Sequence, residues 1–223
     1  MHIEPGIVTG AKIALSYATA AGAAAYALKS TLTEIGARGA ASLATRGVIG
    51  TAAAFSFFQL LPHFPVGVSE VHFILGSTLF LVLGAAPAAI GLALALLLQG
   101  LFLAPFDLPQ YGMNVTTLLV PLFALRWLAA KIIAPGTRYV DLSYGQALAL
   151  STAYQGGVVA WVAFWAFYGQ GVAATAAVAS FGAAYMMVVL IEPLVDLAVL
   201  AGAKSVRDLD RSGLVARRMF HTA

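Results

Sequence analysis

Long apolar stretches separated by short polar segments dominate the chain. A membrane-spanning helix needs about 20 mostly apolar residues, fewer when neighbouring helices shelter it. The strands of a membrane barrel would instead appear as segments of about ten residues with alternating polarity. The pattern therefore predicts an all-α, polytopic membrane protein of about seven transmembrane helices. The predicted spans are Ile7–Leu28, Gly47–Leu61, His72–Leu83, Pro87–Leu103, Met113–Ala130, Tyr144–Tyr168 and Val172–Leu200.

The segments between these spans show no sign of a second, soluble domain. Thr31–Thr45 is expected to lie on the inner side, as a loop or as an amphipathic surface helix. Pro62–His72 contains two prolines and a glycine, which predicts an ordered, non-helical connection. We expect a single domain over residues 1–223, with a short N-terminal segment (1–6) and a basic tail (204–223).

Composition supports the bilayer as the environment of this chain. Hydrophobic residues make up 61% and charged residues only 9%, against roughly 25% charged in an average soluble domain. This excludes an ordinary soluble protein, and it excludes disorder, which requires low hydrophobicity. The absence of cysteine excludes disulfides, thiolate metal sites and cysteine nucleophiles.

The distribution of charge predicts the orientation. With the N-terminus outside, eleven of the twelve basic residues fall on the inner side, as the positive-inside rule requires. The outer segments then carry acidic residues (Glu4, Glu70 and Asp107) and three of the four histidines (His2, His63 and His72). We therefore expect an outer N-terminus, a cytoplasmic C-terminus and an acidic outer mouth.

The N-terminus is the first place where chemistry is expected. The start Met1-His2-Ile3-Glu4 lacks the basic region of a signal peptide, so we expect it to persist in the mature protein. Because His2 is bulky, Met1 should be retained with a free amino group. That amine, the amide nitrogen of His2 and its imidazole can chelate one ion together. An all-nitrogen tetragonal site suits Ni(II) or Cu(II), and Co(II) at some cost.

Two further histidines and two amides are candidates for completing or supporting such a site. His63 and His72 flank the proline-containing loop, although each has a simpler interpretation, as an interfacial residue and as a hydrogen-bonded helix start. Polar side chains within membrane spans are candidates for function. Asn114 is expected either to orient a ligand imidazole or to cap its helix. Gln99 is expected to serve the site or to form an interhelical hydrogen bond.

Three charged residues inside the predicted spans need partners. Lys12 is expected to extend outward or to pair with an outer carboxylate. Glu192 and Asp196 share one helix face because they are four residues apart. We expect them to pair with inner basic residues or with a subunit, and not to bind metal.

Three sequence patches resemble the CbiM/NikM family, the substrate-binding membrane subunits (S-components) of energy-coupling factor transporters for cobalt and nickel. The first is Met1-His2-Ile3 with Gly6, and the second is Ser69-Glu70-Val71-His72 followed by an apolar helix. The third joins the glutamine-containing helix around Gln99 to Gly112-Met113-Asn114. Two features depart from the family pattern: two residues, not one, separate Ser69 from His72, and Glu-Pro-Gly follows Ile3.

The resemblance implies Met1, His2 and His72 as metal ligands, with Asn114, Ser69, Glu70 and Gln99 around them. His63 stays open as a replacement for, or an addition to, His72. Co(II), as for cobalamin synthesis, or Ni(II) would be the transported substrate, and no cofactor is expected. The implied partners are a CbiQ/NikQ-like transmembrane coupling subunit, a CbiO/NikO-like cytoplasmic ATPase and a small accessory membrane protein, all at the bacterial inner membrane.

The sequence lacks the motifs of an enzyme. It has no Walker A, Gly-x-Ser-x-Gly or His-Glu-x-x-His pattern. We therefore expect a transport subunit that binds and conducts an ion, hydrolyses no ATP itself and binds no nucleic acid. Two alternatives stay open: a membrane haem or redox protein that uses His63 and His72, and a purely structural membrane subunit.

Overall fold

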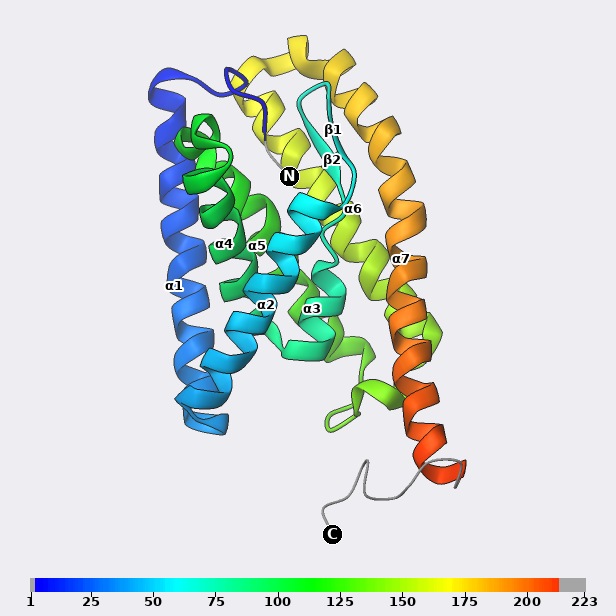
Figure 1. The fold of residues 1–223 in the computed structure, drawn as a ribbon. Helices are drawn as coiled ribbons and strands as arrows, with labels where there is room; N and C mark the ends of the chain where they lie inside the picture. Colours follow the sequence, from blue (N-terminus) through cyan, green and yellow to red (C-terminus); the bar gives the residue numbers. More distant parts are fainter. Residues whose placement is uncertain (1–2, 213–223) are drawn as a thin grey trace.

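A computed structural model describes residues 3–212, which are mostly helical (Figure 1). Its α-helices are α1 (Ile13–Arg38), α2 (Ala40–Leu60), α3 (Gly76–Leu83), α4 (Ala85–Phe102), α5 (Tyr111–Ile132), α6 (Tyr144–Gln170) and α7 (Thr175–Ser212). Short 3-10 helices are η1 (Gly10–Lys12), η2 (Pro105–Gln110), η3 (Tyr139–Asp141) and η4 (Gly171–Ala174). Two antiparallel strands, β1 (His63–Val66) and β2 (Ser69–His72), form a hairpin between α2 and α3. The predicted helical architecture is confirmed, with this hairpin as an addition.

The helices run up and down between two ends that differ in character (Figure 1). The "hairpin end" contains residues 3–12, β1, β2, η2 and η4. The "basic end" contains the α1–α2 turn, the α3–α4 turn, η3 and the end of α7. The cations at the basic end include Arg38, Arg46, Lys131, Arg138 and Lys204. The charge asymmetry expected from the sequence therefore has a structural counterpart.

Four helical stretches of the described chain are long and apolar enough to cross a membrane. They are Ala40–Leu60, Ala85–Phe102, Pro105–Ile132 and Tyr144–Val206, the last of which contains both α6 and α7. They match predicted spans two, four, five, six and seven. The chain is thus a membrane protein, whereas the total of about seven spans and the orientation of the termini stay predictions.

The prediction of a span over His72–Leu83 is wrong. His72 ends β2, and only Gly76–Leu83 is helical. This helix, α3, has 8 residues, which give a length of about 12 Å, less than half of a bilayer core. The turn into it places Leu75 in the left-handed region, with φ 53°. The apolar run predicted as one span therefore consists of a strand end, a turn and a short helix.

The expectation for Thr31–Thr45 is also corrected. No separate surface helix forms there, because α1 continues to Arg38 and α2 begins at Ala40. Gly39 alone separates the two helices, with φ 82°, a backbone conformation that favours glycine.

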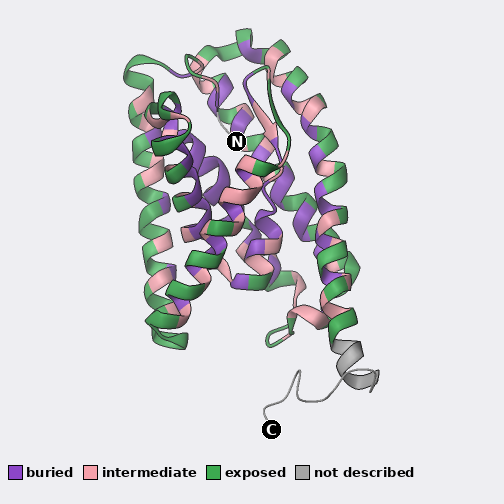
Figure 2. Ribbon diagram, in the orientation of Figure 1, coloured by how far each residue is buried: buried purple, intermediate pink, exposed green. Residues whose placement is uncertain are grey.

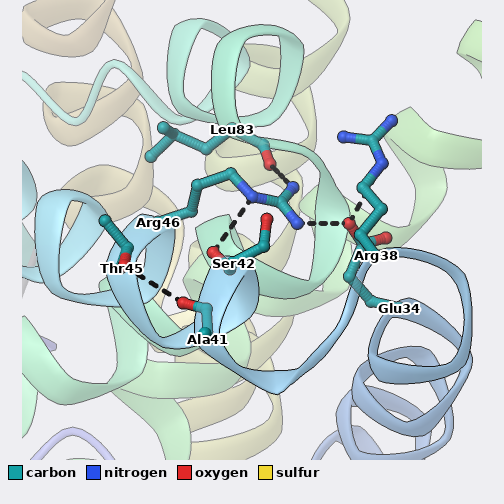
Figure 3. Close-up of polar contacts among 7 residues, drawn as sticks. All are labelled: Glu34, Arg38, Ala41, Ser42, Thr45, Arg46 and Leu83. Carbon is teal, nitrogen blue, oxygen red and sulfur yellow. Dashed lines mark hydrogen bonds and ion pairs between the residues drawn. The ribbon is translucent and has the colours of Figure 1, made fainter.

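Arg46 fixes this α1–α2 turn against the end of α3 (Figure 3). Its guanidinium donates to the carbonyl of Leu83 at 2.7 Å and also pairs with Glu34. Arg38 lies 3.6 Å from the same carboxylate. A cation near the last carbonyls of a helix stabilises that helix end.

The core lies along α4, α5 and α6, whereas α1 and α7 expose much of their length (Figure 2). The exposed residues on these two helices include large apolar side chains, such as Leu28, Leu32, Leu190 and Leu194. In a membrane protein these faces are available to lipid or to other subunits.

Helices α2 and α4 cross at two glycines. A Cβ atom on Gly91 would lie 2.6 Å from the carbonyl carbon of Gly50 and 2.9 Å from the amide nitrogen of Thr51. Small residues permit such close backbone approach in membrane proteins. This crossing supports α2, whose last residues lead into β1.

We expect Gly91→Ala to destabilise the protein by about 1–3 kcal/mol, because the added methyl group forces the two backbones apart. Thermal unfolding of the purified protein in detergent measures the effect. Gly156→Ala on α6 is the matched control, since its Cβ would meet nothing within 4 Å. Equal melting temperatures for the two variants would contradict the role of the crossing.

Candidate functional site

The N-terminal segment is held at the hairpin end by backbone pairing. Ile3 is 1% exposed and forms an antiparallel bridge with Ser69. The amide of Glu4 donates to the carbonyl of Val68 at 3.1 Å. Residue 3 therefore lies beside β2, the strand that carries His72.

The hairpin depends on Gly67. Gly67 and Val68 connect the two strands in a two-residue turn, and Gly67 has φ 63°, as the first position of a type II′ turn requires. The same glycine contacts α7 so closely that a Cβ atom would overlap the carbonyl oxygen of Ala177. The predicted non-helical connection is confirmed, and it is packed against α7.

The strand register places the two candidate histidines opposite each other. His63 and His72 are cross-strand partners, with ring centroids 6.3 Å apart. His63 is exposed, and its Nδ1 lies 3.3 Å from the carbonyl oxygen of Leu61. His72 is 2% exposed and packs edge-on against Phe58 at 5.4 Å between centroids. Of the two candidate histidines, His72 is therefore the buried one, and its ring is packed against a neighbouring side chain.

Asn114 links the N-terminal segment to α5. It is 1% exposed, and its Oδ1 accepts a hydrogen bond from the amide of Ile3 at 2.8 Å. The helix begins at Tyr111, with Gln110 as its capping position, so the helix-capping interpretation of Asn114 is wrong. Asn114 instead fixes the backbone where the N-terminus enters the protein.

The structure places Ser69 and Glu70 beside this N-terminal segment, whereas Gln99 lies on a different helix. Ser69 is fully buried, while Glu70 is half-buried on β2 opposite Pro65. Gln99 is 6% exposed near the end of α4. The main-chain carbonyl of Gln99 accepts from the amides of Leu103 and Ala104 at 2.8 and 2.9 Å, where the helix ends.

The predicted ligands Met1 and His2 lie outside the described residues. Within residues 3–212, no group of three or more histidine, cysteine, aspartate or glutamate side chains is arranged to hold a metal ion. The metal site over Met1, His2 and a loop histidine therefore stays a prediction.

Lys12 contacts the end of α6. Its ammonium donates to the carbonyls of Tyr168 at 3.0 Å and Gly169 at 2.7 Å, at the end of α6. It therefore stabilises a helix C-terminus and joins η1 to α6. These carbonyls take the place of the expected outer carboxylate, and the outward extension of Lys12 stays a prediction.

Glu192 holds the turn that follows His72. This carboxylate is fully buried, and it accepts from the amides of Ile74 at 2.9 Å and Leu75 at 2.7 Å. It also accepts from the side-chain amide of Gln155, whose oxygen in turn accepts from the Tyr185 hydroxyl at 2.8 Å. Sequence reasoning missed this role, and the only signal was an acidic residue in an apolar span.

Asp196 continues the same contact one helical turn further along α7. It accepts from the hydroxyls of Ser77 and Thr78 at the start of α3. The expected basic partners of Glu192 and Asp196 are absent from the described side chains, where backbone amides, an amide side chain and hydroxyls take their place. These two carboxylates therefore join α7 to the β2–α3 turn.

Comparison with solved structures shows that the fold is shared with known transporters. A crystal structure of a transition metal transporter aligns with a TM-score of 0.67 at 18% sequence identity, over 99% of this chain and 100% of that one. A truncated transition metal transporter aligns with a TM-score of 0.64 at 17% identity, over 90% of this chain and 97% of that one. No curated protein sequence matches the chain.

The sequence also matches a family model, described as the cobalt uptake substrate-specific transmembrane region, over residues 2–208. This match includes the N-terminal segment, the hairpin, Asn114 and the Glu192 network. Since the model spans nearly the whole chain, the protein belongs to the CbiM family.

Proposed function

We propose that this protein is the substrate-binding and translocating membrane subunit of an ATP-driven energy-coupling factor transporter that imports a divalent transition metal. Co(II) is the first candidate, with Ni(II) close behind. Support comes from the family, described by cobalt uptake, and from structural neighbours that are transition metal transporters. Family membership favours this function over a haem protein or a structural subunit.

The observation that carries the proposal is the anchoring of Ile3. Asn114 accepts from the amide of Ile3, and Ser69 pairs with it, so the backbone is fixed two residues after the free amine. Consecutive Cα atoms are ~3.8 Å apart, so two residues have a reach of less than about 8 Å from Ile3. On that strand His72 follows Ser69 by three positions, or about 10 Å. These lengths allow one ion to be shared between the N-terminus and the loop.

The proposed ligands are the amino group of Met1, the amide and imidazole nitrogens of His2, and the imidazole of His72. Four nitrogens in a tetragonal arrangement suit Ni(II) and accommodate Co(II). The buried oxygen of Asn114 supports this set indirectly, because it positions the backbone that carries the first two residues.

The proposed orientation puts the hairpin end outside and the basic end in the cytoplasm of a bacterium, across the inner membrane. The positive-inside rule supports this, since the hairpin end carries Lys12 alone among the basic side chains that the structure describes. The partly exposed carboxylates Glu4 and Glu70 then attract cations to the entrance, whereas Asp107 is buried.

The proposed partners follow from the family and from what the sequence lacks. With no Walker A motif in its sequence, this chain needs a separate ATPase to drive release. A CbiQ/NikQ-like coupling subunit and a CbiO/NikO-like ATPase are proposed, with a small accessory membrane protein. We propose no bound cofactor and no nucleic acid.

Isothermal titration of the purified protein with a native N-terminus tests the proposal, using Co(II), Ni(II), Cu(II) and Zn(II). We expect one Co(II) or Ni(II) per chain, and loss of this binding in His2→Ala because the variant lacks the imidazole, one of the three N-terminal nitrogens. His221→Ala is the matched control, since it removes a histidine far along the sequence. Cu(II) serves only as a reference, because it binds many amino-terminal histidines. Absence of Co(II) and Ni(II) binding by the unmodified protein would contradict the proposal.

A further inference from the structure

Most cations that the structure describes have an identifiable partner. Lys12 and Lys204 donate to carbonyls, and Arg46 pairs with Glu34. Arg138 donates to Asp141 at 2.6 Å. The ammonium of Lys131 lies over the ring of Trp127. Lys29 and Arg126 also lack a carboxylate partner among the described side chains, and these two line a cavity together.

Lys29 and Arg126 line one cavity between α1 and α5. The cavity has a volume of about 160 Å³, and Tyr26, Ser30 and Thr33 complete its lining. The guanidinium of Arg126 donates to the hydroxyl of Ser30 at 2.8 Å. Most of its five N–H donors stay available, so the pocket presents two positive charges, unused donors and hydroxyls without a carboxylate.

The surroundings of this pocket are typical of the headgroup level of a membrane protein. Arg126 lies six residues before the end of α5 at Ile132, about 9 Å along the helix axis. The neighbouring Trp127 is 64% exposed, and the ammonium of Lys131 lies 3.5 Å from the centroid of its ring. Exposed tryptophan beside lysine is typical of the headgroup level.

We propose that the Lys29–Arg126 pocket binds the phosphate of an anionic membrane lipid. Arg126 contacts two phosphate oxygens through its planar fork, as guanidinium groups commonly do, and Lys29 adds a second charge. The lipid thereby fills the space between α1 and α5 at the basic end. This site is independent of the metal ligands.

Native mass spectrometry of the full chain in detergent tests the proposal. The protein is titrated with phosphatidylglycerol and, separately, with phosphatidylcholine of the same acyl chains. We expect one phosphatidylglycerol to bind preferentially, and Arg126→Gln to lower its affinity about fivefold, as for one cation near an anionic lipid surface. Lys29→Gln should have a similar effect, and thermal unfolding of each variant confirms that it folds.

Arg138→Gln is the control, because it removes an equal charge from the same end at an exposed residue outside the pocket. Preference lost in the pocket variants and kept in Arg138→Gln supports the proposal. Equal affinity for the two lipids, or equal loss in all three variants, overturns it. Displacement of the lipid by millimolar inorganic phosphate also overturns it, and would identify free phosphate as the ligand. If the unmodified protein shows no lipid preference and Arg126→Gln disrupts assembly with a partner subunit, the proposal is overturned. The pocket would then be assigned to a carboxylate of that partner.

Discussion

Replacing His72 with alanine is expected to lower the affinity for Co(II) or Ni(II) by at least about 100-fold. The imidazole is 2% exposed and lies on the strand to which Ile3 is paired. Loss of a direct ligand should exceed the 10–100-fold effect typical of residues that only support a ligand. Isothermal titration with native N-termini measures the change.

His63→Ala is the matched comparison, because the two histidines are cross-strand partners of the same hairpin. We expect its affinity to stay within about threefold of the unmodified protein, since the exposed His63 is less constrained than His72. The reverse ranking would assign the fourth ligand to His63. Unchanged affinity in both variants would exclude the hairpin from the metal site.

The parts of the fold that the sequence predicted well are those determined by local composition. The apolar runs around α4 and α6 are long, and their limits agree with the predicted spans within a few residues. Burial of Asn114 was also foreseeable, because a polar side chain in an apolar run must face protein. In these cases the information lies within one helix.

Contacts between distant positions were not predictable in this way. Lys12 reaches carbonyls 156 and 157 residues away, and Glu192 accepts from an amide 118 residues away. A charge inside an apolar run indicates that a partner exists, but backbone partners leave no mark on the sequence. Charged partners were therefore expected where the structure has backbone groups.

The hairpin shows a second limit of prediction from sequence. A local turn signal was outweighed by the apolar run that follows it. The glycine at position 67 is typical of a two-residue hairpin turn. The apolar residues that follow His72 favoured a helix beginning there. In the structure a non-glycine residue, Leu75, adopts φ 53° before α3 begins. Such a conformation costs of order 1–3 kcal/mol and persists only where its surroundings enforce it.

Those surroundings are supplied mainly by Glu192, and Glu192→Gln is expected to destabilise the protein by about 2–3 kcal/mol. Both carboxylate oxygens accept from N–H donors, from Ile74 on one and from Leu75 and Gln155 on the other. Glutamine has the same shape but replaces one oxygen with an NH₂ group, which brings donors against donors. A buried donor left without an acceptor costs about 1–3 kcal/mol. Thermal unfolding in detergent measures this loss.

The same substitution should also weaken metal binding, because the turn at Ile74 and Leu75 directly follows His72. Glu34→Gln is the control, since it alters a carboxylate in the Arg46 cluster at the basic end, where its side chain is 23% exposed and water can replace lost contacts. We expect the control to keep its affinity for Co(II) and most of its stability. If Glu192→Gln melts and binds Co(II) as the unmodified protein does, the carboxylate does not hold the turn. Lower stability with unchanged affinity would instead mean that α7 supports the fold without positioning His72.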